Sequence, residues 1–258
     1  MQKLKARFNS PDGSTYGSLQ SCVRTNDLDL IGDGSHLTSF VMVGNFSFGG
    51  PSYEHSADLW TAILDDLGLR DGSVIHVHPS RPDHRRLWES RGFAVVDDSE
   101  CVWTDGNIGG HCCEVYYGGL EIGNLVNTLE HSTDVGFGLE RVLQILEGKS
   151  RVDDTSLFNQ QDHPIVRDHL RTLQLMRDCG VVPGNKGRGS ICKRLLRRTM
   201  LHTDGTGTAV RDWIEVERAS HCKRMDTGKR AWKKHKDKSP EWWMDTFGIM
   251  PEELYLLV

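Results

Sequence analysis

Short runs rich in β-branched, aromatic and other apolar residues recur through the first half of the chain, and Gly, Asp or Pro bounds each run. Runs of this length between turn-forming residues are typical of β-strands. They lie at residues 19–24, 37–43, 74–77, 112–117 and 120–126. We therefore expect a largely antiparallel sheet in this half of the chain.

Apolar residues recur at helical spacing in three further segments, and a glycine stands where each helix would end. The segments are residues 56–67, 139–146 and 165–176, followed by Gly68, Gly148 and Gly180. Helices that alternate with strands of an antiparallel sheet predict an α+β fold.

A break in the pattern around residues 181–189, which contain Pro183 and several glycines, separates the second half of the chain. Beyond it, Ser190 is a candidate N-cap for a helix over residues 191–200. We expect two domains, at residues 1–155 and 156–258, and the second should be smaller, mostly helical and basic.

The formal net charge of −5 hides a separation of charge along the sequence. Residues 1–184 hold 15 Lys and Arg against 26 Asp and Glu, whereas residues 185–236 hold 15 against 5. A basic segment that follows an acidic body is typical of polyanion binding, because Lys and Arg supply most non-specific affinity for nucleic acids. A solvated helical face is the alternative that charge alone leaves open.

No run of apolar residues approaches the roughly 18 needed to cross a bilayer, and the first residues lack the apolar core of a signal peptide. The seven cysteines are an odd number and are scattered through apolar segments. Free thiols in a reducing compartment fit this usage better than disulfides. We therefore expect a cytoplasmic protein without membrane segments.

Residues 38–49 have the sequence TSFVMVGNFSFG, and residues 21–24 have the sequence SCVR. An Arg at the end of a strand can bind a phosphate bidentately and offset charge that develops there. The two stretches together resemble motif 2 of alanyl-tRNA synthetase, a class II aminoacyl-tRNA synthetase. The resemblance implies that Arg24 is catalytic and binds the α-phosphate of ATP, and that Phe40 stacks on adenine.

Residues 133–141 have the sequence TDVGFGLER, which resembles motif 3 of the same family. We expect a glycine-rich turn that opens a helix, so that backbone can approach a nucleotide. The resemblance implies that Gly136, Gly138 and Arg141 bind ATP, with Arg141 also catalytic. It further implies an amino-acid pocket formed by Trp103, Asn124, Val126 and Asp134, in which the Asp134 carboxylate pairs with the substrate's ammonium group.

Residues 166–171 (VRDHLR) and 185–198 (NKGRGSICKRLLRR) resemble the helical domain with which the family grips the tRNA acceptor stem. The tRNA-binding residues that this implies are Arg188, Lys193, Arg194, Arg197 and Arg198. Gly187 stands where the family has an Asn that helps to recognise its tRNA. The resemblance extends from about residue 15 to about residue 250.

The resemblance implies a class II synthetase-like antiparallel sheet flanked by helices and a ligase that uses ATP and Mg²⁺. The expected reaction activates a small amino acid, with alanine favoured and glycine or serine possible, to an aminoacyl adenylate and transfers it to a tRNA 3′ end. Glu114 is a possible Mg²⁺ contact. Two alternatives stay open: transfer to a carrier-protein thiol or a small amine, and a catalytically degenerate paralogue that binds RNA or protein.

The sequence also departs from the family pattern. Compared with the family, the chain lacks the motif 1 region, has a shorter motif 2 loop, and ends before the editing and C-terminal domains, so we expect a truncated paralogue of undetermined oligomeric state. His111, Cys112 and Cys113, with Cys101, could form a metal cluster. Adjacent cysteines on a strand point to opposite faces, however, and their spacing fits no common zinc motif, so we do not expect zinc to bind this run.

Overall fold

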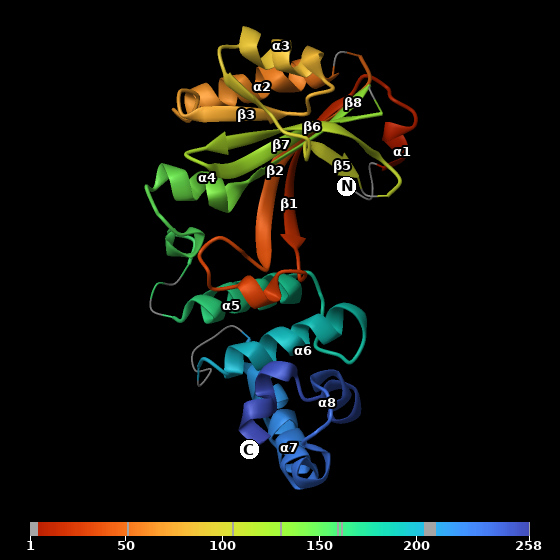
Figure 1. The fold of residues 1–258 in the computed structure, drawn as a ribbon, viewed down its shortest axis with the longest axis vertical. Helices are drawn as coiled ribbons and strands as arrows, with labels where there is room; N and C mark the ends of the chain where they lie inside the picture. Colours follow the sequence, from red (N-terminus) through yellow and green to blue (C-terminus); the bar gives the residue numbers. More distant parts are fainter. Residues whose placement is uncertain are drawn as a thin grey trace. The chain divides into compact units, whose positions relative to one another are not determined.

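The computed structural model describes residues 5–50, 52–104, 106–129, 131–158, 160, 162–203 and 210–257, and the chain forms two compact units. Unit 1 comprises residues 1–24 and 33–158, and unit 2 comprises residues 25–32 and 159–258 (Figure 1). The chain therefore passes from unit 1 into unit 2 at residue 25 and returns to unit 1 at residue 33. None of the described helices is both long enough and apolar enough to cross a membrane.

Unit 1 is built on an eight-stranded sheet with the order β1-β2-β8-β7-β6-β3-β4, and β5 pairs with β6. Among the described strands, β3 and β4 pair in parallel and all other pairs are antiparallel. The strands are β1 Thr15–Val23, β2 Ser39–Phe48, β3 Ser73–Val77, β4 Ala94–Asp97, β5 Val102–Thr104, β6 Gly109–Tyr117, β7 Leu120–Thr128 and β8 Ser132–Gly138. The predicted α+β class and antiparallel sheet are confirmed.

Helices cover one face of this sheet, as Figure 1 shows for α2 and α3. The helices of unit 1 are α1 Lys5–Phe8, α2 Ser52–Asp66, α3 Pro82–Ser90 and α4 Leu139–Leu146. Alternate strand residues such as Val115, Leu125 and Phe137 face α2 and α3 and form the main core with them. Trp60 of α2 stacks on Phe137 with ring centroids 3.9 Å apart. The opposite face of the central strands carries a smaller cluster, in which Phe8 of α1 packs against Phe46 and Phe48.

Two sequence predictions about elements near the site need correction. Residues 133–138, which we predicted as a glycine-rich turn, belong to β8, a strand paired on both edges by β2 and β7. Strand pairing prevails because Gly136 and Gly138 stand in a segment whose residues alternate between the two faces of the sheet. The helix predicted to begin after Ser190 instead begins at Gly187, and the Ser190 hydroxyl donates to the Gly187 carbonyl within it.

Unit 2 is helical and has its own core. Its elements are η1 Leu28–Leu30, α5 Pro164–Asp178, α6 Gly187–Met200, α7 Arg211–His235, α8 Pro240–Phe247 and η3 Pro251–Leu257. Leu28 and Ile31 pack with apolar residues of α5 and α6, including Leu173 and Leu195. A second cluster surrounds Trp243, which is fully buried. Residues 203–208 have the sequence TDGTGT, which predicts a loop, and they lie almost entirely outside the described residues.

Candidate active site

The register of the sheet places most of the predicted site residues on one face. Asp134 of β8 pairs directly with Phe46 of β2 on one side and with Val126 of β7 on the other. Val126 in turn pairs with Cys112 of β6. Partners in an antiparallel ladder point to the same face, and so do residues two apart on one strand. This face is opposite to the one covered by α2 and α3. We call it the site face.

Further predicted residues join the site face by the same alternation. Asn124 pairs with Gly136 on one side and with Glu114 on the other. Gly138 pairs with Met42, and Phe40 lies two residues before Met42 on β2. Trp103 of β5 pairs with Gly110 of β6 and packs against Cys101, Cys112 and Val126. The structure therefore assembles residues that are dispersed in the sequence between positions 40 and 138.

Asp134 is the principal acid at the centre of this face. Burial raises the pKa of its carboxyl group to about 7, because desolvation disfavours the charged form. An ammonium group bound beside it would favour the ionised form again. Such a carboxyl group is suited to bind a cationic substrate group in a partly desolvated pocket.

Arg24 directly follows β1, and its backbone continues the ladder with β2. Its N–H donates to the Thr38 carbonyl at 2.9 Å, and Cys22 pairs with Phe40. Extending this register places Arg24 opposite Thr38, on the site face and diagonal to Phe40. Its guanidinium is exposed, as a contact with a nucleotide phosphate would require.

Arg141 lies in the first turn of α4, at the end of β8. Its Nη1 donates to the Glu121 carbonyl at 2.8 Å and to the Glu121 carboxylate at 3.0 Å. A Cβ at Gly138 would lie 3.8 Å from Cδ of Arg141, so the Arg141 stem passes over that glycine. In this conformation Glu121 holds the guanidinium, and a phosphate contact would require Arg141 to exchange that partner.

A neighbouring carboxylate, Glu140, has a structural role that the sequence did not indicate. Glu140 is buried, and its two oxygens accept from the Val41 N–H at 3.1 and 3.0 Å. This contact connects α4 to β2 between Phe40 and Met42, and so stabilises the strand that carries the predicted adenine-stacking residue. The sequence GFGLER does not indicate that Glu140 is buried, because an acidic residue beside Arg141 is equally compatible with an exposed helix.

Glu114 does not lie in an environment typical of Mg²⁺. Burial raises the pKa of its carboxyl group, which accepts a hydrogen bond from the Tyr116 hydroxyl at 2.9 Å. Ligand atoms of Cys101, Cys112 and Glu114 all lie within 4.8 Å of one another. Mg²⁺ prefers oxygen ligands only, so these donors do not fit it.

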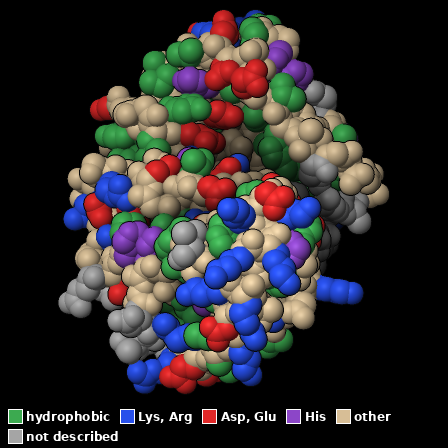
Figure 2. Space-filling view, turned by 60° about the horizontal axis from the view of Figure 1, so that its bottom comes forward, with side chains coloured by type: hydrophobic (Ala, Val, Ile, Leu, Met, Phe, Trp, Pro, Cys, Tyr) green, Lys and Arg blue, Asp and Glu red, His purple; other side chains and the backbone are tan. Residues whose placement is uncertain are grey.

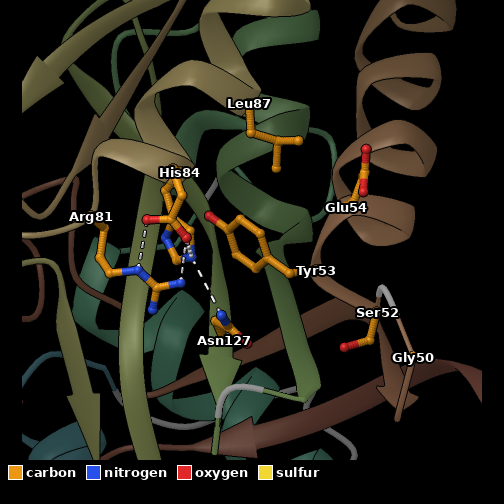
Figure 3. Close-up of a pocket in the computed structure, with 9 residues that line it drawn as sticks. Gly50, Ser52, Tyr53, Glu54, Arg81, His84, Leu87 and Asn127 are labelled. Carbon is orange, nitrogen blue, oxygen red and sulfur yellow. Dashed lines mark hydrogen bonds and ion pairs between the residues drawn. The ribbon is translucent and has the colours of Figure 1, made fainter.

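A cavity of about 390 Å³ lies on the helix-covered side of the sheet (Figure 3). Its lining includes Tyr53, whose ring stacks on His84 at 4.0 Å, and the Arg81–Asp83 ion pair. Asn127 of β7 also lines it, one residue from Val126 and therefore on the opposite face. None of the predicted site residues is among the described residues that line this cavity.

Basic side chains gather on the surface of unit 2, as Figure 2 shows over its helices. Arg188 is exposed near the start of α6. On the same helix, the Lys193 ammonium group donates to the Asn185 side chain at 2.7 Å, and Arg194 lies 3.9 Å from the carboxylate of Asp29. These three cations are on the surface of α6 and can meet a polyanion.

The sequence predicts that Arg197 and Arg198 contact RNA. In the structure both side chains make contacts within unit 2. Arg197 donates to the Gly248 carbonyl at 2.7 Å, and burial lowers the pKa of its guanidinium. Arg198 is 9% exposed and donates to the Leu28 carbonyl at 2.9 Å and to the Glu252 carboxylate at 3.0 Å. In this structure both arginines therefore make internal contacts that stabilise unit 2.

The chain is similar to alanine–tRNA ligases of bacteria. The chain is 31% identical to an alanine–tRNA ligase of Rhizobium johnstonii over 257 residues, and this match covers 75% of the chain and 29% of that protein. It is 30% identical to the alanine–tRNA ligase of Granulibacter bethesdensis over 270 residues, covering 78% of the chain and 31% of that protein. The chain therefore spans less than a third of the length of these relatives. No family model matches it.

Among solved structures, the chain is similar to histidyl-tRNA synthetase of S. aureus, with 12% identity, a TM-score of 0.39, and coverage of 68% of this chain and 57% of that one. A pyrrolysyl-tRNA synthetase from Desulfitobacterium hafniense gives 16% identity, a TM-score of 0.36, and coverage of 60% and 48%.

Proposed function

Because the chain contains an alanyl-tRNA synthetase-like catalytic core, we propose that it is a ligase that activates a small amino acid with ATP, with alanine favoured. The observation that carries this proposal is the site face, where Phe40, Gly136 and Asp134 come from the adjacent strands β2 and β8, and Arg24 directly follows β1, the strand that pairs with β2. The nucleotide lies over β2 and β8, and the amino acid lies over β7 and β8.

The proposed reaction needs positioning and charge neutralisation more than proton transfer. The amino acid's carboxylate attacks the α-phosphorus of ATP, the bond to pyrophosphate breaks, and an aminoacyl adenylate forms. Asp134 holds the ammonium group, and Asn124 and Val126 with Trp103 line the remaining pocket. Arg24 offsets the charge that develops on the α-phosphate. In this reaction ATP binds as its Mg²⁺ complex, in which the ion is bound to the phosphates.

The adenylation step is tested by amino-acid-dependent exchange of pyrophosphate into ATP, with each of the twenty amino acids. Arg24→Ala should lower exchange with the best amino acid about a hundredfold, the usual loss when one donor to a developing anion is removed. Arg86→Ala is the matched control, because Arg86 is exposed on α3. A wild-type chain without exchange for any amino acid would argue against the proposal.

For the acceptor, we propose the 3′ end of a tRNA bound by Arg188, Lys193 and Arg194. The Lys193→Ala/Arg194→Ala double variant should bind tRNA about tenfold more weakly, and the slope of log Kd against log salt should fall by about 2. Filter binding over a salt series measures both quantities. Lys149→Ala, an exposed substitution in unit 1, serves as control. If the wild-type chain adenylates an amino acid but does not bind tRNA, the acceptor is a carrier-protein thiol or a small amine.

A further inference from the structure

Two thiols and a carboxylate meet on the site face, at the β5–β6 end of the sheet. Val102 of β5 pairs with His111 of β6, so Cys101 and Cys112 face each other directly, and the Cys112 N–H donates to the Cys101 carbonyl at 3.0 Å. Glu114 lies two residues after Cys112 and therefore on the same face. Their ligand atoms all lie within 4.8 Å of one another.

The surroundings of this cluster are those of a built site. Cys101 is 0% and Cys112 2% exposed, and both pack against Val126 and Trp103. The Tyr116 hydroxyl donates to Oε2 of Glu114 at 2.9 Å, which orients the carboxylate and leaves its second oxygen for another partner. A hydrogen bond of this kind, from outside the ligand set, commonly orients metal ligands.

We propose that Cys101, Cys112 and Glu114 bind one Zn²⁺ ion and leave its fourth coordination position open. Two sulfurs and one oxygen form a donor set suited to zinc, and three protein ligands with an open position are typical of zinc sites that bind a substrate. Zn–S bonds of about 2.3 Å imply sulfurs about 3.8 Å apart in a tetrahedron, so side-chain movements of about 1 Å complete the site. This inference goes beyond the proposed ligase activity and does not depend on it.

The register also indicates what the open position meets. Cys112 pairs with Val126 and Glu114 pairs with Asn124, so the ion lies one strand from the proposed amino-acid pocket. A substrate group with a lone pair, such as an amine, hydroxyl or thiol, would complete the tetrahedron. Cys113 cannot take part, because it lies in the core on the helix-covered face.

The test is metal analysis of the whole chain, purified under reducing conditions and reconstituted with Zn²⁺ or Co²⁺. We expect one Zn²⁺ per chain and, with Co²⁺, a thiolate charge-transfer absorption. Cys101→Ser and Cys112→Ser should weaken Zn²⁺ binding at least tenfold, whereas Cys113→Ser, the neighbouring buried cysteine, should keep it. Glu114→Gln retains both thiols and should also weaken binding, which guards against loss through misfolding.

Three outcomes would overturn the proposal. The first is a reduced wild-type chain that binds neither metal ion. The second is metal content that Cys101→Ser and Cys112→Ser leave unchanged. The third is a Cys101–Cys112 disulfide that persists in the purified reduced chain, seen by mass spectrometry as the loss of two hydrogens, because the thiols would then be unavailable as ligands.

Discussion

Asp134→Asn is expected to lower amino-acid-dependent ATP–pyrophosphate exchange about a thousandfold. Removing one partner of a partly desolvated charge pair typically costs about 2–5 kcal/mol, and the neutral amide cannot replace the carboxylate opposite an ammonium group. The loss should appear mainly in kcat/KM for the amino acid, with little change in the KM for ATP. Asp71→Asn, an exposed substitution in the same unit, is the matched control.

The pH dependence of the same variant provides a second, independent measurement. With a pKa of about 7, the wild-type carboxyl group is half ionised near neutrality, so kcat/KM should rise with pH and level off above about 8. The folded-state pKa lies above the unfolded value of about 3.9, so the folded state holds the proton more tightly. Stability from Asp134 is therefore present near pH 4 and is lost as the pH rises towards 7.

Thermal unfolding checks this sign. Asn mimics the protonated acid, so the unfolding temperature of Asp134→Asn relative to the wild-type protein should be higher at pH 8 than at pH 4. A variant that keeps its exchange activity would remove Asp134 from the proposed pocket. Lost activity with unchanged pH dependence of stability would instead indicate a carboxyl group that is already ionised.

The strands of unit 1 could be predicted where turn residues bound a short apolar run, as for β3 and β7. Strand β8 could not, because the glycines of TDVGFG are as typical of a turn as of a strand. Its position is set by long-range pairing with β2 and β7. A Cβ at Gly136 would lie 2.3 Å from the terminal methyl group of Met42, a flexible side chain that can move aside.

The resemblance identified candidate residues, but the sequence alone could not show how they combine. Asp134, Val126 and Cys112 come from three consecutive strands and are adjacent because these antiparallel strands share one register. The same register explains why the cluster of Cys101, Cys112 and Glu114 could not be predicted from the sequence. Cys112 and Cys113 are neighbours in the sequence but point to opposite faces, whereas Cys101 directly precedes β5.

Unit 2 shows the clearest gap between sequence pattern and structure. Segment 25–32 lies more than a hundred residues before the rest of that unit, and no local pattern indicates that it packs there. Leu28 supplies both an apolar side chain to the core and a carbonyl that accepts from Arg198. From the sequence alone, an arginine in a basic helix predicts a polyanion-binding surface. The distant carbonyl that binds Arg198 becomes known only from the structure.

Arg198→Met should therefore destabilise unit 2 by about 3 kcal/mol, a loss typical when one member of a buried ionic network is removed. The variant leaves the Leu28 carbonyl without its charged donor and takes a partner from Glu252 and from His169, whose Nε2 lies 3.2 Å from Nε of Arg198. Because the contact partner Asp29 is largely exposed, its ion pair adds little. Denaturant unfolding followed by circular dichroism measures the change.

Arg194→Met is the matched control, since Arg194 is four residues earlier on α6, is 40% exposed, and lies 3.9 Å from Asp29. Its substitution should cost less than about 1 kcal/mol while weakening tRNA binding. The two arginines thus separate fold from proposed function on a single helix: one should alter the free energy of unfolding, and the other the affinity for a polyanion. An Arg198→Met chain as stable as the wild-type protein but deficient in tRNA binding would return Arg198 to the RNA-contact role that the sequence alone predicted.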